Sequence, residues 1–333
     1  MSIKVEKPGL LTTLQDLGRF GYQKQGMVVS GAMDSFALRL ANLLVGNAEG
    51  EAALEINFVG PSLEFQQDCL ISLTGANLSP KLNGKLVPMN RPIYLKKGTL
   101  LEFGSPVLGC RAYLAMAGGF DVPLVMGSAS TYVRAGLGGW QGRALQKGDE
   151  LPLKGMPPKQ LAYWQQNCPV QKAFEVAKWG VSPDLLPPYA DQPTIRVLPG
   201  PEYELFTQAS KESFWQQSFQ VSKASDRMGY RVEGPALQLK QPVELISSAV
   251  TFGMVQVTPN GNPIILMAEH QTTGGYPRIG QVITADLPVL AQVKPGSCLR
   301  FQEVTLAEAQ ALYYQQERNL EHLKRAIFLQ LKR

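Results

Sequence analysis

The stretch that most restricts the fold of this chain is residues 251–286. Its two apolar runs, 251–258 and 263–267, are rich in Val, Ile and Met, and the residues between them, Pro-Asn-Gly-Asn, have the composition of a tight turn. Two such runs joined by so short a turn pair as neighbouring antiparallel strands. The stretch therefore predicts a β-hairpin.

A polar segment, residues 268–278, follows the second strand of this hairpin without a break. Its side chains can donate and accept hydrogen bonds, and two adjacent glycines, Gly274 and Gly275, can adopt positive φ and let a ligand or another backbone come close. Such a segment contributes little to a core, so it suits a site at a strand end. A solvated loop ended by Pro277 is the alternative, because Gly, Thr and Pro are common in loops.

Short apolar runs with turn residues between them recur in the first half of the chain. The dipeptide Asn83-Gly84 is a signal for a type I′ turn between two of them. This spacing indicates an antiparallel barrel or sandwich and not a β-α-β fold. The predicted strands are 54–58, 62–65, 69–74, 81–82, 92–95, 99–103 and 109–117.

Helical patterns are fewer. In 35–45 the apolar residues Phe36, Leu40, Leu43 and Leu44 fall on one face, and Asp34 or Ser35 is placed to cap the N-terminus. A helical turn is expected at 163–168 and a short helix around 204–209. A capping box at 305–308 opens a helical segment that extends to 331, as one long helix or two shorter ones.

Three motifs of the first half are echoed in the same order in the second half: 16–22 by 225–231, 113–120 by 266–276, and 147–151 by 294–299. Such echoes are typical of duplicated domains. Residues 154–193 are rich in Pro and Gln and lack a strong period, as linkers do. We therefore predict a first β domain at 1–153, a linker at 154–193, a second β domain at 194–304 and a C-terminal helical segment at 305–333.

The composition excludes several classes of protein. With 333 residues, 44% hydrophobic and 18% charged, the chain is long and apolar enough for about two folded domains. Much of the net charge of +5 lies at the C-terminus, and the absence of a basic block with interleaved aromatic residues argues against nucleic-acid binding. Without a signal-peptide pattern or a run of about 18 apolar residues, we expect a soluble cytoplasmic protein with no membrane segment.

Several kinds of catalytic site are also excluded. The four cysteines are widely separated and form no CxxC pair, so the sequence predicts neither a zinc knuckle nor a redox dithiol, and a reducing compartment fits. Two histidines, His270 and His322, cannot build a histidine-rich metal site, so we expect no metal site. A nucleophile elbow, a Walker-type phosphate loop and a Rossmann glycine motif are all missing.

Four sequence motifs are spread along nearly the whole chain: PG followed by TTLQDLGRFG in 8–21, ANLLVGN in 41–47, SDRMGYR in 225–231 and QTTGGYP in 271–277. Together they resemble the KipA family, also called the biotin-dependent carboxyltransferase or allophanate hydrolase subunit 2 family. The resemblance implies a mainly β fold of two tandem cyclophilin-like β-barrel domains, with a few short helices and a C-terminal helix.

The resemblance also implies a role inside an enzyme complex. The family's 5-oxoprolinase members act with two partners, one LamB/YcsF-like and one KipI-like, to open the lactam 5-oxo-L-proline to L-glutamate, with hydrolysis of ATP. We therefore expect an ATP-hydrolysing enzyme acting on a cyclic amide, with ATP and Mg²⁺ shared across the complex. Two alternatives stay open: the carboxyltransferase component of a urea carboxylase-like enzyme, which would use biotin, and a non-catalytic regulator that binds a KipI-like inhibitor of a sensor kinase.

The candidate site residues combine cationic, amide, hydroxyl and carboxylate side chains. A guanidinium can grip carboxylate or phosphate with two hydrogen bonds. Amide and hydroxyl groups can contact the lactam or a phosphate, and an aspartate can orient an arginine or activate water. The catalytic candidates are Asp16, Arg19, Asp34, Gln271, Thr272 and Thr273, and the substrate- or nucleotide-binding candidates are Arg134, Arg143, Arg227, Gly274, Gly275 and Tyr276. For each of them, stabilising a tight barrel loop is the alternative role, and Asp16 could pair with Arg19.

Overall fold

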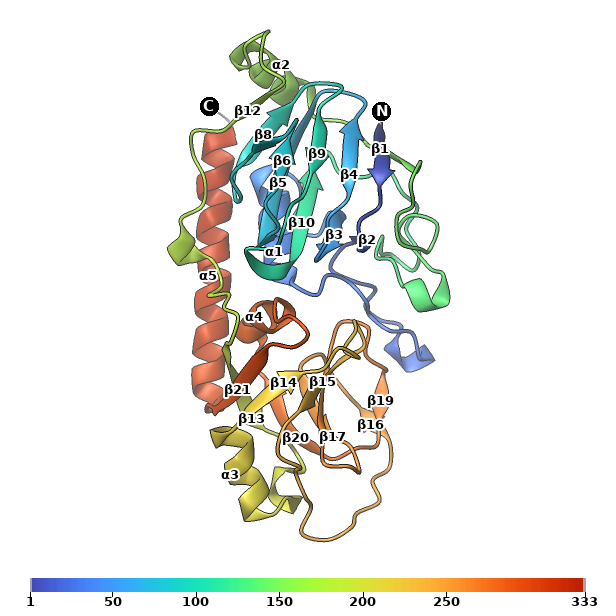
Figure 1. Ribbon diagram of the computed structural model, residues 1–333, viewed down its shortest axis with the longest axis vertical. Helices are drawn as coiled ribbons and strands as arrows, with labels where there is room; N and C mark the ends of the chain where they lie inside the picture. Colours follow the sequence, from blue (N-terminus) through green and yellow to red (C-terminus); the bar gives the residue numbers. More distant parts are fainter. Residues whose placement is uncertain (1, 332–333) are drawn as a thin grey trace. The chain divides into compact units, whose positions relative to one another are not determined.

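A computed structural model describes residues 2–331 as two compact units (Figure 1). The first unit contains the residues up to Arg19, Asp34–Leu186 and the residues from Asn319 onward, and the second contains Phe20–Met33 and Pro187–Arg318. Met1, Lys332 and Arg333 lie outside the described residues, and so do the last two positions of the helical segment predicted at 305–333.

Antiparallel strands of the first unit form two six-stranded sheets (Figure 1). In spatial order, one sheet contains β11 (Glu150–Pro152), β1 (Ser2–Lys7), β4 (Ser62–Phe65), β9 (Leu100–Glu102), β6 (Lys81–Leu82) and β7 (Lys85–Leu86). The other contains β12 (Phe174–Val176), β8 (Pro92–Leu95), β5 (Cys69–Asn77), β10 (Leu108–Met116), β3 (Ala53–Asn57) and β2 (Leu11–Gln15). Asn83 and Gly84, both with positive φ, join β6 to β7 as the predicted tight turn.

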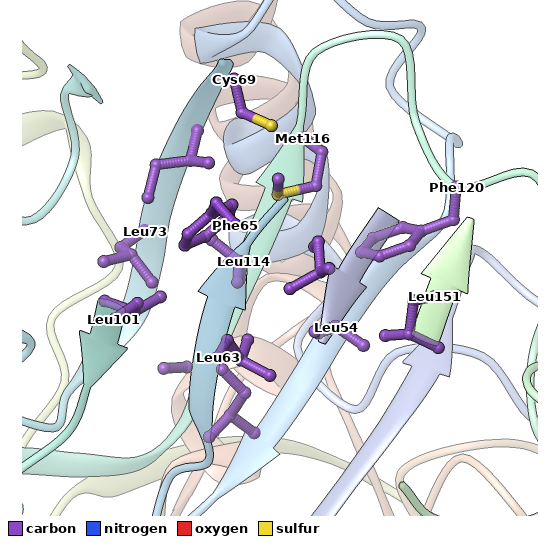
Figure 2. Packing of buried hydrophobic residues seen from close by; sticks show 14 of the residues in the cluster. Leu54, Leu63, Phe65, Cys69, Leu73, Leu101, Leu114, Met116, Phe120 and Leu151 are labelled. Carbon is purple, nitrogen blue, oxygen red and sulfur yellow. The ribbon is translucent and has the colours of Figure 1, made fainter. Parts of the chain in front are cut away.

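The core of the first unit lies between these sheets. Side chains alternate between the two faces of a strand, so every second residue of β5 and β10 enters the core. Burial of apolar surface, at about 25 cal/mol per Å², is the main term that holds the sheets together. Figure 2 shows side chains from both sheets turned toward one another, among them Leu63, Phe65 and Leu101 from one sheet and Leu54, Leu73 and Leu114 from the other.

Helix α1 (Ser35–Leu44) lies against the outward face of β5. Two hydroxyl groups on that face hold the helix: Ser72 Oγ donates to the carbonyl oxygen of Ala41 at 2.6 Å, and Thr74 Oγ1 donates to that of Ala37 at 2.7 Å. The predicted apolar face of α1 is confirmed, because it packs against the last turns of α5 (Leu306–Leu331). The α5 residues in this cluster are Leu320, Leu323, Ile327 and Leu331.

The strands of the second unit close into a barrel. In order around it stand β13 (Thr194–Pro199), β20 (Arg278–Val282), β17 (Met254–Val257), β18 (Pro263–Leu266), β15 (Gly229–Glu233), β14 (Ser218–Val221) and β21 (Cys298–Glu303). The β13–β21 pair is parallel and the other pairs are antiparallel. Strands β17 and β18 are the hairpin predicted from the sequence, which is confirmed.

Alternation along the strands also fixes the two faces of the barrel wall. Val255 and Val257 of β17 belong to the barrel core, whereas Met254 belongs to a separate small cluster outside it. A short two-stranded ribbon, β16 (Ser248–Ala249) with β19 (Thr273–Gly274), accompanies the barrel. The remaining helices of this unit are α3 (Gln208–Gln216) and α4 (Leu287–Ala291), with 3-10 turns at Gln23–Gln25, Tyr203–Leu205 and Thr284–Asp286.

The predicted fold class, mainly β with a few short helices and a C-terminal helix, is confirmed. The C-terminal segment is one continuous helix. The helix expected around 204–209 was misplaced: a 3-10 turn stands at Tyr203–Leu205, and Thr207 caps α3, which therefore begins at Gln208. The turn expected at 163–168 belongs to a longer helix, α2 (Pro158–Asn167).

The observed units differ from the predicted division in two places. Within the predicted linker, β12 pairs with β8, and Trp164 of α2 stacks on Tyr94 of β8 with ring centroids 6.1 Å apart. A 3-10 turn, Pro183–Leu185, follows in the same segment. Residues 20–33, placed by the sequence in the first domain, cluster with the second unit. Composition, on which the boundaries rested, does not report such long-range pairing. None of the helices within residues 2–331 has both the length and the apolar character that crossing a bilayer requires.

Candidate functional site

The polar segment that follows β18 is an ordered ribbon. Thr273 and Gly274 pair with Ala249 and Ser248, and the amide of Val250 donates to the carbonyl oxygen of Thr272 at 3.2 Å. The side chains of Gln271 and Thr273 are exposed, whereas Gly274 is buried. The segment therefore presents amide and hydroxyl groups from a fixed backbone, as a binding site at a strand end requires.

Gly274 lies directly against β17. A Cβ atom at Gly274 would stand 2.5 Å from Nε2 of Gln256 and 3.1 Å from Nε2 of Gln271, so two side-chain amides converge on this glycine. Close approach is thus the reason for glycine at this position, since its φ is not positive. Gln256 was not among the residues predicted from the sequence.

Arg227 and Glu269 form a buried ion pair beside the same segment. The Nε of Arg227 donates to Oε1 of Glu269 at 2.6 Å, and its Nη2 donates to the carbonyl oxygen of Gly31 at 2.5 Å. The Arg227 side chain is tied at the same time by backbone contact, because the amide of Glu269 donates to the carbonyl oxygen of Arg227. This geometry favours a clamp between three segments of the second unit over an anion-holding role for Arg227.

A pocket of about 770 Å³ opens beside the end of the ribbon. Gly275, Tyr276 and Pro277 line it, together with the turn at 258–261 and residues 236–239 and 242–245. Its volume suits a small ligand, for which about 300–1,000 Å³ is usual. Of the predicted binding residues, Gly275 and Tyr276 reach this pocket, whereas Gln271, Thr272 and Thr273 are not part of its described lining.

Burial lowers the pKa of His270, next to this ribbon, from its ordinary value of 6.5. Its Nδ1 lies 2.6 Å from the carbonyl oxygen of Gln271. The folded chain therefore favours the neutral imidazole, whereas the unfolded chain binds a proton below about pH 6.5. Stability attributable to His270 is complete above that pH and is lost as the pH falls toward the folded-state pKa.

We expect His270→Gln to flatten the fall in the free energy of unfolding between about pH 7.5 and pH 5.5, because it removes the group that the unfolded chain protonates first. Urea unfolding at a series of pH values measures this slope. His322→Gln, at an exposed position on α5, is the matched control and should leave the slope unchanged. Equal slopes for wild type and His270→Gln would contradict the assignment.

In the first unit, Asp16 is the centre of a hydrogen-bond cluster. Its side chain, 8% exposed, accepts from Oγ of Ser128 at 2.7 Å, Oγ of Ser130 at 2.5 Å, the amide of Ala129 at 2.6 Å and the amide of Gly18 at 2.7 Å. A carboxylate has about four lone-pair sites, so these donors fill them. The arrangement favours fixing the loop at 127–143 over activating water, and the catalytic role of Asp16 stays a prediction.

Arg19 belongs to the same cluster and is 1% exposed. Its Nη2 donates to the carbonyl oxygen of Ser130, and Gly138, with φ of 67°, lies so close to both that a Cβ there would overlap them. Asp16 and Arg19 are thus brought together around Ser130. Arg134, on the 3-10 turn Val133–Ala135 of the same loop, is exposed.

Asp34 is fully buried and caps α1, as one of the two predicted caps: its Oδ1 accepts from the amide of Ala37 at 2.9 Å. Its own amide donates to the hydroxyl of Tyr113 at 2.8 Å, and that hydroxyl donates to Oε2 of the buried Glu55 at 2.7 Å. Burial, followed by the charges of Glu55 and Asp34, raises the pKa of Tyr113 well above its ordinary value. This network was not predicted, because Glu55 and Tyr113 lie inside strands that otherwise have a core pattern.

Arg143 makes a bidentate pair with Asp149, with both N–O distances 2.8 Å. Its guanidinium holds the pKa of Asp149 below the ordinary value. The same guanidinium donates to the carbonyl oxygen of Ala144 and to Oε1 of Gln141. The predicted anion-binding role of Arg143 is therefore taken within the chain by a carboxylate six residues further on.

Cysteine chemistry adds no nucleophile to either cluster. Burial raises the pKa of Cys69 to about 12, so its thiol stays protonated at neutral pH. Cys110 and Cys168 are also buried, and the described cysteines are free thiols. What the geometry offers is hydrogen bonding by amides and hydroxyls, which is suited to holding a small polar molecule.

Comparisons with known proteins agree with this fold. Residues 25–303 match the family described as carboxyltransferase domain, subdomain A and B. The chain is 42% identical to the C subunit of 5-oxoprolinase from Haemophilus influenzae, over 95% of each chain. It is 40% identical to the C subunit of 5-oxoprolinase from Escherichia coli, over 96% of this chain and 97% of that one. Among solved structures, urea amidolyase of K. lactis superposes with a TM-score of 0.87 at 31% identity, over 97% of this chain but 20% of that chain.

Proposed function

Because the chain belongs to the carboxyltransferase domain family, subdomains A and B, we propose that it is the C subunit of an ATP-dependent 5-oxoprolinase, which opens 5-oxo-L-proline to L-glutamate. The observation that carries this proposal is the match to two bacterial 5-oxoprolinase subunits from end to end. Urea amidolyase matches at lower identity and is about five times longer. The name of those relatives supports a complex of several subunits.

The reaction places a clear demand on the site. A lactam amide is a poor electrophile, and transfer of the γ-phosphoryl group of ATP to its oxygen would make the ring carbon open to attack by water. This chain would contribute hydrogen bonds that hold the lactam in place. Gln271, Thr272 and Thr273, on the fixed backbone of the ribbon, are the proposed donors and acceptors.

The arginines of the chain fit an ATP phosphate site poorly. Arg19, Arg143 and Arg227 already donate to carbonyl or carboxylate oxygens of the chain. Arg134 is the member of the predicted set with an exposed side chain. We therefore propose that ATP and Mg²⁺ draw their main contacts from two partner proteins of the complex, one KipI-like and one LamB/YcsF-like. The buried free thiols support a cytoplasmic location for the complex.

The test is an assay of 5-oxoproline-dependent ADP release, with the chain alone and with the two partners. We expect ADP release above background only when all three proteins are present, and none when proline, which lacks the lactam carbonyl, replaces 5-oxoproline. Transfer of a carboxyl group from carboxybiotin to urea, without turnover of 5-oxoproline, would move the assignment to a carboxyltransferase. Altered sensor-kinase activity without turnover of either substrate would identify a regulator.

A carboxyltransferase role is the second candidate. The near-complete superposition on urea amidolyase favours it, because that enzyme's name places urea chemistry on a chain containing this fold. Biotin would then be the carrier cofactor. The same assay decides between the two, since each substrate is supplied separately.

A further inference from the structure

The side-chain amide of Gln256 is a buried donor without a use inside the described chain. Gln256 stands in β17 between Val255 and Val257, and its side chain is 2% exposed. Its Nε2 has no hydrogen-bond partner within residues 2–331. Burial of an N–H group without an acceptor is unfavourable, and folded proteins contain few such groups.

Packing does not account for glutamine at this position. Gln256 is directly opposite Ile264 across the hairpin, and the cluster on this side of the barrel wall contains Val250, Met254 and Leu266. An apolar side chain of the same length, such as methionine, would fill the space with no unpaired polar atom. A register shift between Val255 and Gln256, relative to β20, also displaces this residue from the regular ladder.

The donor is aimed at the polar ribbon. Nε2 of Gln256 and Nε2 of Gln271 both lie within 3.1 Å of the point where a Cβ of Gly274 would stand. One amide is buried and the other is exposed, so together they line the space left by a missing side chain from its inner end to its outer end. Two neutral donors without a positive charge are matched to a neutral carbonyl oxygen better than to a phosphate.

We propose that Gln256, together with Gln271, binds the carbonyl oxygen of the lactam substrate and so distinguishes a cyclic amide from the ring without a carbonyl. This inference rests on the proposed function and adds to it a substrate-binding residue and the group that it recognises. Gln256 holds the carbonyl in place and takes no proton. Gly274 is part of the same device, because it leaves room for the oxygen.

The test uses the complete complex with Gln256→Met in this chain. We expect KM for 5-oxoproline to rise about tenfold, the value of one hydrogen bond of about 1.4 kcal/mol, with kcat changed much less. The melting temperature of the chain should stay the same or rise, since an unpaired buried amide is removed. Gly274→Ala, which pushes a methyl group against the Gln256 amide, should raise KM in the same way.

Gln281→Met is the matched control. This glutamine also lies in the barrel wall, but its Nε2 donates to the carbonyl oxygens of Phe252 and Val282 at 2.9 and 3.0 Å. We expect Gln281→Met to lower the melting temperature by several degrees, roughly the effect of losing one or two hydrogen bonds, and to leave KM unchanged.

An active complex with an unchanged KM in Gln256→Met overturns the inference and leaves the proposed function intact. A lower melting temperature in Gln256→Met with no change in KM assigns Gln256 a structural role and overturns it as well. A wild-type complex that releases no ADP with 5-oxoproline overturns the proposed function, and the lactam assignment of Gln256 with it.

Discussion

Replacing Arg227 with alanine is expected to lower the free energy of unfolding by about 3–5 kcal/mol, because the buried Glu269 carboxylate is left without its cationic partner. Both side chains are nearly inaccessible, 8% and 5% exposed, so water cannot take over the role of the guanidinium. The carbonyl oxygen of Gly31 also loses its donor. Urea unfolding of the purified chain measures the change, and hydrogen exchange should rise in residues 27–33 and 267–270.

Arg231→Ala is the matched control for this prediction. Arg231 is two residues into β15 and exposed, so its loss should change the free energy of unfolding by no more than about 0.5 kcal/mol. A double variant, Arg227→Ala with Glu269→Gln, should be less destabilised than the two single losses together, since no charge is then left buried alone. Wild-type stability in Arg227→Ala, with weaker binding of anions to the complex, would restore the anion-holding role predicted from the sequence.

The lysine variant separates the two roles of Arg227 further. Lysine retains the charge but has no planar fork, so it cannot reach Glu269 and Gly31 at once with the same geometry. We therefore expect Arg227→Lys to recover part of the stability lost in Arg227→Ala. A phosphate-holding arginine replaced by lysine would instead retain stability throughout and change only ligand affinity.

The features predicted correctly from the sequence are those encoded within a few residues. The hairpin of β17 and β18 follows from two apolar runs and a turn of four residues, and Asn83-Gly84 specifies the β6–β7 turn by its own φ preferences. Asp34 caps α1 because its carboxylate is three residues from the amide that it accepts. Local chemistry is enough for each of these.

The roles of charged residues could not be predicted in the same way, because their partners are distant in the sequence. Asp16 and Ser128 are 112 positions apart, and Arg227 and Glu269 are 42 apart. An arginine in a glycine-rich motif has the same pattern whether it binds a phosphate or a backbone carbonyl. Gln256 was missed for a related reason: a glutamine between two valines indicates an outward, solvated position, and only the fold places Gly274 against it.

Asp16→Ala should have an effect of similar size in the first unit, a loss of about 3 kcal/mol in the free energy of unfolding, because it leaves several buried donors without an acceptor. Asp16→Asn should lose less, about 1–2 kcal/mol. Its oxygen can still accept from Ser128, Ser130 and Gly18 at the Oδ1 position, while its NH₂ group would face the amide of Ala129.

Asp121→Ala is the control for this series, since Asp121 is an exposed aspartate in the same stretch between β10 and β11 and should change stability by no more than about 0.5 kcal/mol. The order of the series distinguishes the two roles of Asp16. A carboxylate that fixes the loop gives graded stability losses, with alanine worse than asparagine. A carboxylate that activates water would give full loss of turnover in both variants at nearly wild-type stability, because the amide of asparagine cannot accept a proton from water.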